Sequence, residues 1–293
     1  MKRVNPFHDV YQKMDYDDLH AKYPHTVDVE LTNHCNLRCS FCCRRIMTRM
    51  QGSMNDGTFH RILNEITEPR IPVRFIRWGE PLLHPKILEY SRLVKERGLP
   101  LHITTNGQLL DEGMMQALVD MELDSIIFSM QGYDREGYKR NRVGGDYDVL
   151  SRNIRKLVRL RGCREKPFIM VTTTVDNPNS KDTEYFMSYW NRIVDKVRVG
   201  RTVLSWFDDK ILSNLDHPVC YEPFRQLSFN WNGDVTACCG DYDGLLVVGN
   251  IHQSSLLELW NSKLLEAIRT IVSCGCYNYL TLCGKCDFGS ITE

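Results

Sequence analysis

Between Thr26 and about Val203, short runs of apolar and β-branched residues alternate with longer stretches of helical periodicity. Such alternation is typical of βαβ units around a parallel sheet, in which functional residues gather at the carboxyl ends of the strands. The predicted strands are Thr26–Leu31, Val73–Arg77, Leu101–Thr105, Ser125–Ser129, Phe168–Val175 and Lys196–Val199, and the predicted helices are Asn55–Thr67, Pro85–Arg97, Asp111–Met121, Tyr147–Arg161 and Asp182–Ile193.

Six strand–helix units are too few for a closed barrel of eight strands, so we expect an α/β fold that forms an open, partial (β/α)6 barrel. After about Ser205, Gly and Asp become more frequent and the apolar runs shorten. There, Gln226–Thr236 predicts a hairpin that turns at Asn232-Gly233, and Ser254–Ile271 predicts one helix. We therefore expect an N-terminal extension at 1–25, the barrel at 26–205 and a small α+β iron–sulfur domain at 206–293.

The composition excludes several classes of protein. Lys plus Arg and Asp plus Glu are both 37, which argues against binding to nucleic acid or to a membrane surface. No apolar run is long enough for a membrane helix, and residues 1–25 lack the core of a signal peptide. We expect a cytoplasmic protein, in which 12 cysteines indicate metal or redox chemistry rather than disulfides.

The first group of cysteines follows the first predicted strand. Cys35, Cys39 and Cys42 have the spacing Cys-x3-Cys-x2-Cys. Three thiolates can hold a four-iron cluster and leave one iron open, much as an open position marks a catalytic zinc site. A zinc loop or three unrelated thiols are the alternatives. Zinc loops usually combine CxxC pairs, so this spacing favours the cluster.

With the aromatic Phe41 before its last cysteine, this triplet resembles the cluster loop of the radical SAM superfamily. Residues at the ends of the later predicted strands are similar to further motifs of that family. Because these motifs occur in the family's order, one at each strand end, the set as a whole is specific for the family. One departure is Trp78, which stands where the family's Gly-Gly-Glu-Pro motif has its first glycine. The matching residues are Gly79, Glu80 and Pro81 after the second strand, Thr105 and Asn106 at the third, Ser129 at the fourth, and Arg142 beyond it.

The resemblance implies a partner for each part of S-adenosyl-L-methionine (SAM). Glu80 and the backbone near it would hold the methionine amino group, Ser129 the ribose, and Arg142 the carboxylate. A reduced 4Fe–4S cluster on the cysteine triplet would donate one electron to SAM. The resulting 5′-deoxyadenosyl radical would then abstract a hydrogen atom from a substrate, while the protein orients the reactants and excludes water.

Such chemistry implies an electron donor of the flavodoxin or ferredoxin type. The stretch 135–166 is strongly basic. We interpret it as a solvated helix face, and the alternative is a docking surface for an acidic electron donor or an anionic substrate.

A second group of cysteines lies in the last third of the chain. Cys220 and Cys238 flank the predicted hairpin, and Cys283 and Cys286 form a CxxC pair. Four thiolates can complete a closed metal site. The segment 238–262 resembles the SPASM extension of radical SAM enzymes, or its shorter twitch form. This resemblance implies one auxiliary 4Fe–4S cluster on these four cysteines; a structural zinc on the same ligands is the alternative.

Three more cysteines of this region are candidate hydrogen-atom donors to a substrate radical: Cys239, Cys274 and Cys276. Cys239 follows a proposed cluster ligand, and it would point the other way if Cys238 lay on a strand.

Three reactions on a substrate follow from this reading. The first is oxidation of an alcohol carbon of a small sugar or aminocyclitol, in natural-product or glycan metabolism, with the auxiliary cluster as electron acceptor. The four-cysteine arrangement is similar to that of aminocyclitol dehydrogenases. The second is epimerisation of a sugar or aminoglycoside, completed by a cysteine thiol. The third is peptide modification, which the short segment before the first strand makes less favoured.

Overall fold

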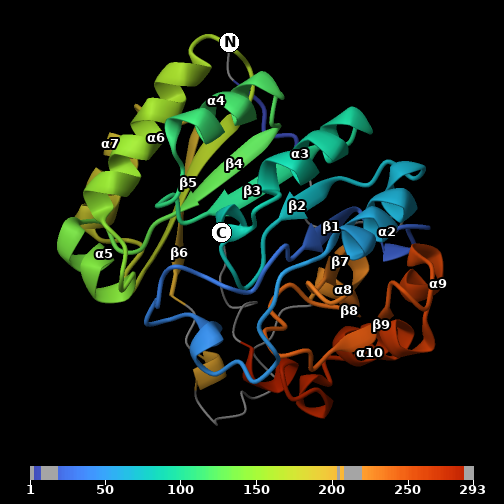
Figure 1. Ribbon diagram of the computed structural model, residues 1–293. Coiled ribbons are helices and arrows are strands. Elements are labelled where there is room, and N and C mark those ends of the chain that lie inside the picture. Colours follow the sequence, from blue (N-terminus) through green and yellow to red (C-terminus); the bar gives the residue numbers. More distant parts are fainter. Residues whose placement is uncertain (1–2, 8–18, 203–204, 208–219, 287–293) are drawn as a thin grey trace.

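The computed structural model describes residues 3–7, 19–202, 205–207 and 220–286. Part of the predicted N-terminal extension at 1–25 therefore lies outside the described residues. One open sheet of nine strands runs through the described part of the chain, in the order β6-β5-β4-β3-β2-β1-β7-β8-β9 (Figure 1). The strands are β1 (Thr26–Val29), β2 (Val73–Phe75), β3 (Leu101–Thr105), β4 (Ser125–Ser129), β5 (Phe168–Val175), β6 (Lys196–Arg201), β7 (Gln226–Phe229), β8 (Asp234–Thr236) and β9 (Val247–Asn250).

The first six strands form the partial barrel that the sequence predicts. Each pairs in parallel with the next, and both ends of the sheet are open. Helices lie along the outer side of the curved sheet (Figure 1). They are α2 (Asp56–Thr67), α3 (Ile87–Glu96), α4 (Glu112–Asp120), α6 (Tyr147–Arg161) and α7 (Lys181–Trp190), with the short α5 (Arg135–Asn141) after β4.

The helix ends have the expected chemistry. The Asn55 side chain caps α2 by accepting a hydrogen bond from the amide of Thr58. Gly98 and Gly162, which follow α3 and α6, have φ angles of +69° and +57° that favour glycine. The start of α3 differs from the prediction: Pro85 precedes the N-cap, and the helix begins at Ile87.

The C-terminal strands extend the barrel sheet instead of forming a sheet of their own. β7 pairs in parallel with β1, so that Leu227 lies opposite Val27. β8 and β9 then add antiparallel strands, and the turn of the predicted hairpin contains Gly233 at φ +89°. We call the described residues from Ser205 onward the auxiliary region. Its first strand, β7, lies at the edge of the barrel next to β1, the strand that leads into the first cysteine group.

The prediction of one helix over Ser254–Ile271 is wrong. The structure has α9 (Leu256–Trp260) and α10 (Lys263–Ser273), separated at Asn261-Ser262. The Ser262 side chain accepts a hydrogen bond from the amide of Leu265, and this cap starts a new helix where the apolar spacing alone suggests continuation. The short helix α5, capped by Asp134, was also missing from the sequence prediction. Among the described residues, no helix combines the length and the apolar character needed to span a membrane.

A buried ion pair joins the two parts of the sheet. Asp28 on β1 accepts a hydrogen bond of 2.6 Å from Arg74 on β2, and both side chains are almost fully buried. The Arg74 guanidinium also donates to Gln226, the first residue of β7. Three neighbouring strands therefore share one guanidinium.

Replacement of Arg74 by Leu leaves the Asp28 carboxylate buried without its cation. We expect the free energy of unfolding to fall by about 3–5 kcal/mol, measured by urea denaturation of the cluster-loaded protein. The double variant Asp28→Leu with Arg74→Leu removes both charges and should recover much of this loss. An equal loss in both variants would contradict the assignment.

Candidate functional site

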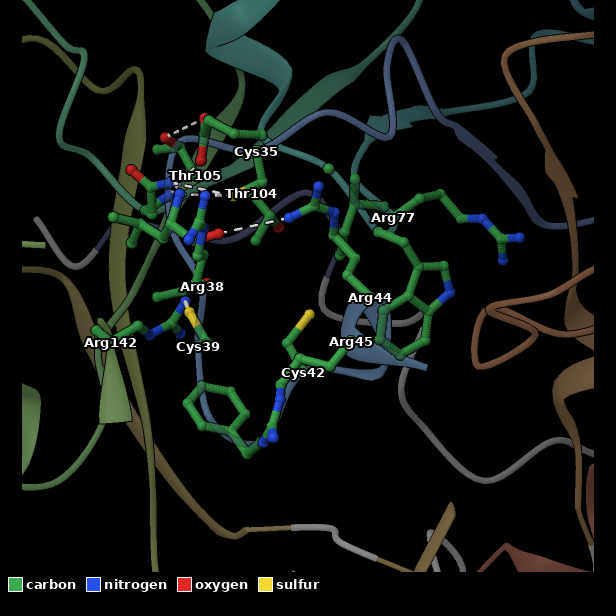
Figure 2. Close-up of a pocket in the computed structure, with 18 residues that line it drawn as sticks. Cys35, Arg38, Cys39, Cys42, Arg44, Arg45, Arg77, Thr104, Thr105 and Arg142 are labelled. Carbon is green, nitrogen blue, oxygen red and sulfur yellow. Dashed lines mark hydrogen bonds between the residues drawn. The ribbon is translucent and has the colours of Figure 1, made fainter. Parts of the chain in front are cut away.

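A cavity of about 440 Å³ lies at the carboxyl ends of β1 to β4 (Figure 2). Its lining comes from the segments that follow these four strands, as expected for a parallel α/β fold. The residues that the sequence singles out in this lining are Cys35, Cys39, Phe41 and Cys42 after β1, Gly79 and Glu80 after β2, Thr105 and Asn106 at β3, Ser129 at β4, and Arg142. Pro81 is buried beside them, where it begins a short 3-10 helix.

The cysteine loop is bonded to the C-terminal end of α5 and to the residues just after it. The amide of Arg38 donates to the carbonyl of Val143 at 2.9 Å, and the amide of Ser40 donates to the carbonyl of Asn141 at 2.8 Å. Both bonds are made by main-chain amides of the loop, so they do not engage its three cysteine side chains. The three thiols line the cavity. Burial raises the pKa values of the Cys35 and Cys42 thiols.

Glu80 joins two of the predicted motifs. Its side chain is only 2% exposed, and it accepts hydrogen bonds from the Thr105 hydroxyl and from the amide of Asn106, both at 2.7 Å. Burial raises the pKa of this carboxyl group, and the hydrogen bonds oppose that rise. A carboxylate fixed in this way suits a cationic ligand such as the methionine ammonium of SAM.

Gly79 is required by a close approach of two backbone segments. A Cβ atom at this position would lie 1.9 Å from the carbonyl oxygen of Thr32. The amide of Glu80 donates to the carbonyl of His34 at 2.9 Å, which ties the second motif to the start of the cysteine loop.

Arg142 contacts the cysteine loop directly. Its Nη1 lies 3.6 Å from the Cys39 sulfur, its Nη2 donates to the carbonyl of Met130 at 3.1 Å, and its guanidinium lies over the Phe41 ring. The Nε of Arg142 is buried and has no hydrogen-bond partner among the described residues. The guanidinium lines the cavity, and its contact to the SAM carboxylate stays a prediction.

The residues present fit a cluster with SAM. Among the described residues, no three Cys, His, Asp or Glu side chains converge on a single metal ion. A four-iron cluster has no such requirement, because each thiolate binds a different iron. Three thiols around one hollow, with a buried carboxylate beside them, match this arrangement better than a zinc site.

Arg77 and Trp78 connect the cavity to the auxiliary region. Arg77 has a φ angle of +131°, a strained value for a residue other than glycine. Its guanidinium donates to the carbonyls of Cys238, Cys239 and Asp241 at 2.9–3.0 Å. Trp78 packs edge-on against aromatic rings of the auxiliary region, so this departure from the family motif serves the contact between the two parts. The sequence did not indicate this role for either residue.

The structure brings the four predicted auxiliary ligands together. Burial raises the pKa of the Cys220 thiol, and the charges of Glu222, Cys283 and Cys286 raise it further. The pKa of Cys283 is raised to about 12 by burial and by the charge of Cys286. Cys238 also interacts with Cys220 and Cys286. Neighbouring thiols raise one another's pKa values because their thiolates repel. A metal cluster bound among them would supply the positive charge that stabilises the thiolates.

The three remaining candidates lie elsewhere. Cys238 lies two residues beyond β8, so the strand alternation does not apply, and the Cys239 thiol contacts both Cys238 and the Glu222 carboxylate. Cys274 is exposed at the end of α10, and the Cys276 thiol lies 3.6 Å from the carbonyl oxygen of Cys274. The cavity lining includes none of these three residues.

The basic stretch predicted at 135–166 contributes to a separate hollow of about 520 Å³ between α5, α6 and α7. Arginines and aromatic rings line it, and Arg155 lies over the Tyr189 and Trp190 rings. It shares no lining residue with the cavity of the cysteine loop.

Comparison with known proteins identifies the family. A model described as the radical SAM superfamily matches residues 29–184, more than half of the chain. The chain belongs to the radical SAM superfamily. A second model, SPASM, described as an iron–sulfur cluster-binding domain, matches residues 220–287. This radical SAM enzyme therefore uses SAM and iron–sulfur clusters as cofactors.

The proteins to which this chain is similar are named for different targets or were solved with different ligands. A Pyrococcus furiosus protein, named as a cofactor-modifying protein of tungsten-containing aldehyde ferredoxin oxidoreductase, is 27% identical over 90% of this chain and 89% of its own. The structure of BtrN in complex with AdoMet and 2-DOIA has a TM-score of 0.63 at 19% identity, over 90% of this chain and 92% of that one. Streptococcus suis SuiB, bound to precursor peptide SuiA, has a TM-score of 0.63 at 16% identity, over 85% of this chain and 67% of that one. The two structures support the radical SAM partial-barrel fold and leave the substrate open.

Iron content tests the two predicted ligand sets. We expect about eight irons per chain after anaerobic reconstitution, and about four when either Cys39 or Cys283 is replaced by Ala. Cys163→Ala, at an exposed position, is the matched control and should keep the full content. About four irons together with one zinc in the unaltered enzyme would contradict an auxiliary iron–sulfur cluster on these ligands.

The role of Glu80 is testable by SAM binding. Glu80→Gln keeps the shape of the side chain and removes its charge, so SAM affinity should fall about tenfold or more in equilibrium dialysis with the reconstituted enzyme. Glu89→Gln, on the exposed face of α3, is the control and should bind SAM normally. Unchanged affinity of the Glu80 variant would remove this residue from the SAM site.

Proposed function

We propose that this radical SAM enzyme oxidises an alcohol carbon of a small sugar-like molecule by two electrons. When bound, the reduced cluster and SAM supply the radical that removes a hydrogen atom from the substrate. In the whole reaction the alcohol loses that hydrogen atom, its hydroxyl proton and one electron, and a carbonyl forms. The proton would pass to a base or to water, and an auxiliary cluster held by the four later cysteines would supply the acceptor for the electron.

The placement of the thiols carries this proposal. Cys220, Cys238, Cys283 and Cys286 supply four ligands, which leaves an auxiliary cluster no open iron for a substrate. Such a site suits electron transfer. Epimerisation instead needs a thiol that faces the substrate radical, and the only cysteines in the described lining are the three of the cluster loop.

The described contacts also favour transfer between the two parts of the chain. Arg77 lies two residues after β2, in the cavity lining, and donates to the carbonyl of Cys238, one of the proposed auxiliary ligands. Arg49 adds a second link, since it pairs with Glu30 after β1 and donates to the carbonyl of Tyr242. The proposal includes a flavodoxin- or ferredoxin-type protein as the source of the first electron and the cytoplasm as the compartment.

The mass of the product separates the candidate reactions. Reduced enzyme with SAM, incubated anaerobically with a panel of sugars and cyclitols, should give a product lighter by two hydrogens, together with 5′-deoxyadenosine. The double variant Cys274→Ala with Cys276→Ala should keep this turnover, provided that its iron content is normal. A product of unchanged mass that takes up deuterium from solvent would indicate epimerisation, and turnover of a peptide alone would indicate peptide modification.

A further inference from the structure

The cavity carries an excess of positive charge. Its described lining contains one carboxylate, Glu80, and five guanidinium groups, which stay charged at any physiological pH. One of the five, Arg77, is turned away from the cysteine loop toward the auxiliary region (Figure 2). The other four surround the hollow with the three thiols: Arg38, Arg44, Arg45 and Arg142.

No carboxylate among the described residues forms an ion pair with these four guanidinium groups. Arg44 donates to the carbonyls of Asn33 and Leu37 at 2.8 and 3.4 Å. Arg45 donates to the carbonyl of Ser40 at 2.6 Å. Arg142 contacts a carbonyl and the Cys39 sulfur, as described above. Within the described part of the chain, their acceptors are backbone carbonyls and one thiol sulfur, and no carboxylate there pairs with them.

The cofactors do not cancel this excess. A cluster held by three thiolates carries about one negative charge, and SAM carries about one net positive charge, since its sulfonium and ammonium outweigh its carboxylate. These two contributions offset each other. Against four guanidinium groups, Glu80 supplies at most one negative charge. Because like charges around one hollow repel one another, an anionic occupant is favoured there and a cationic one is opposed.

Arg38 and Arg45 are the best placed to bind such an occupant. Both are exposed and line the cavity: Arg38 lies between Cys35 and Cys39, and Arg45 follows Cys42. The Arg38 side chain forms no hydrogen bond or ion pair with another described residue. Within the described ranges, one nitrogen of Arg45 forms a hydrogen bond, and its guanidinium lies 6.0 Å from the centre of the Phe207 ring. A planar guanidinium group can donate two parallel hydrogen bonds to the oxygens of a phosphate or carboxylate group.

We propose that the substrate is an anionic alcohol, such as a sugar phosphate or a sugar acid, whose anionic group is bound by Arg38 and Arg45. This inference rests on the proposed function and narrows it, because an aminocyclitol with ammonium groups would be repelled by the same cavity. The anionic group at the cavity mouth would orient the alcohol carbon toward the SAM site.

Binding of inorganic phosphate tests the site without turnover. Calorimetric titration of the reconstituted, SAM-loaded and unreduced enzyme should show saturable binding. Arg38→Gln and Arg45→Gln should each weaken it about tenfold or more. Arg92→Gln, at an exposed position on α3 outside the cavity, is the matched control and should bind phosphate normally. Absence of saturable binding, or binding that survives both substitutions, would overturn the proposal.

Organic probes then identify the anionic group and separate this inference from the proposed reaction. Glucose 6-phosphate and glucuronate should both compete with inorganic phosphate for the site. Stronger competition by glucose 6-phosphate indicates that the substrate's anionic group is a phosphate, and stronger competition by glucuronate indicates a carboxylate. Equal or better competition by glucose or glucosamine would overturn the inference. Arginine-dependent phosphate binding without any oxidised product would refute the reaction and leave the anion site in place. Oxidation of neutral or amino sugars that is insensitive to Arg38→Gln would refute the anion site alone.

Discussion

The guanidinium of Arg74 joins three neighbouring strands, and the position of the second cluster region depends on it. Arg74 pairs with Asp28 and donates to Gln226, so β7 is held beside β1. A buried charge requires its partners, which makes this pairing far more demanding than an apolar contact. The strand that leads into the cysteine loop thus lies next to the strand that leads toward Cys238, although about 200 residues of chain separate them.

Three residues after Arg74, just beyond the end of β2, a strained residue serves the same purpose. Arg77 adopts an unfavourable backbone angle, and five oxygen atoms of the auxiliary region accept hydrogen bonds from its guanidinium. Strained residues persist when their surroundings determine them, and they concentrate at functional sites. Glu80 follows three residues later, so one short segment positions both the buried carboxylate of the cavity and the contacts to the auxiliary region. The protein's own contribution is therefore position and charge, while the cofactors supply the difficult chemistry.

Much of the fold was predictable because local patterns and tertiary packing agree. The bounds of β3, β4, β5 and α6 match the predicted ranges, since apolar runs and caps mark their ends. The break between α9 and α10 was missed because the Ser262 cap outweighs a continuous apolar pattern. The parallel pairing of β7 with β1 was also missed, because hydrogen bonding between distant strands leaves no local signal.

The sequence by itself determined the kinds of groups available: the cysteine triplet, the four later cysteines, and the motif residues at the strand ends. These are local properties, since spacing and backbone preference decide how a loop presents its ligands. Only the tertiary structure decided which groups meet. Arg38, Arg44 and Arg45 are adjacent to the cluster cysteines in the sequence, but whether a carboxylate neutralises a guanidinium depends on the residues that other strands bring into the cavity. Coulomb interaction follows distance in space and not along the chain, so the charge of the cavity emerges only after folding.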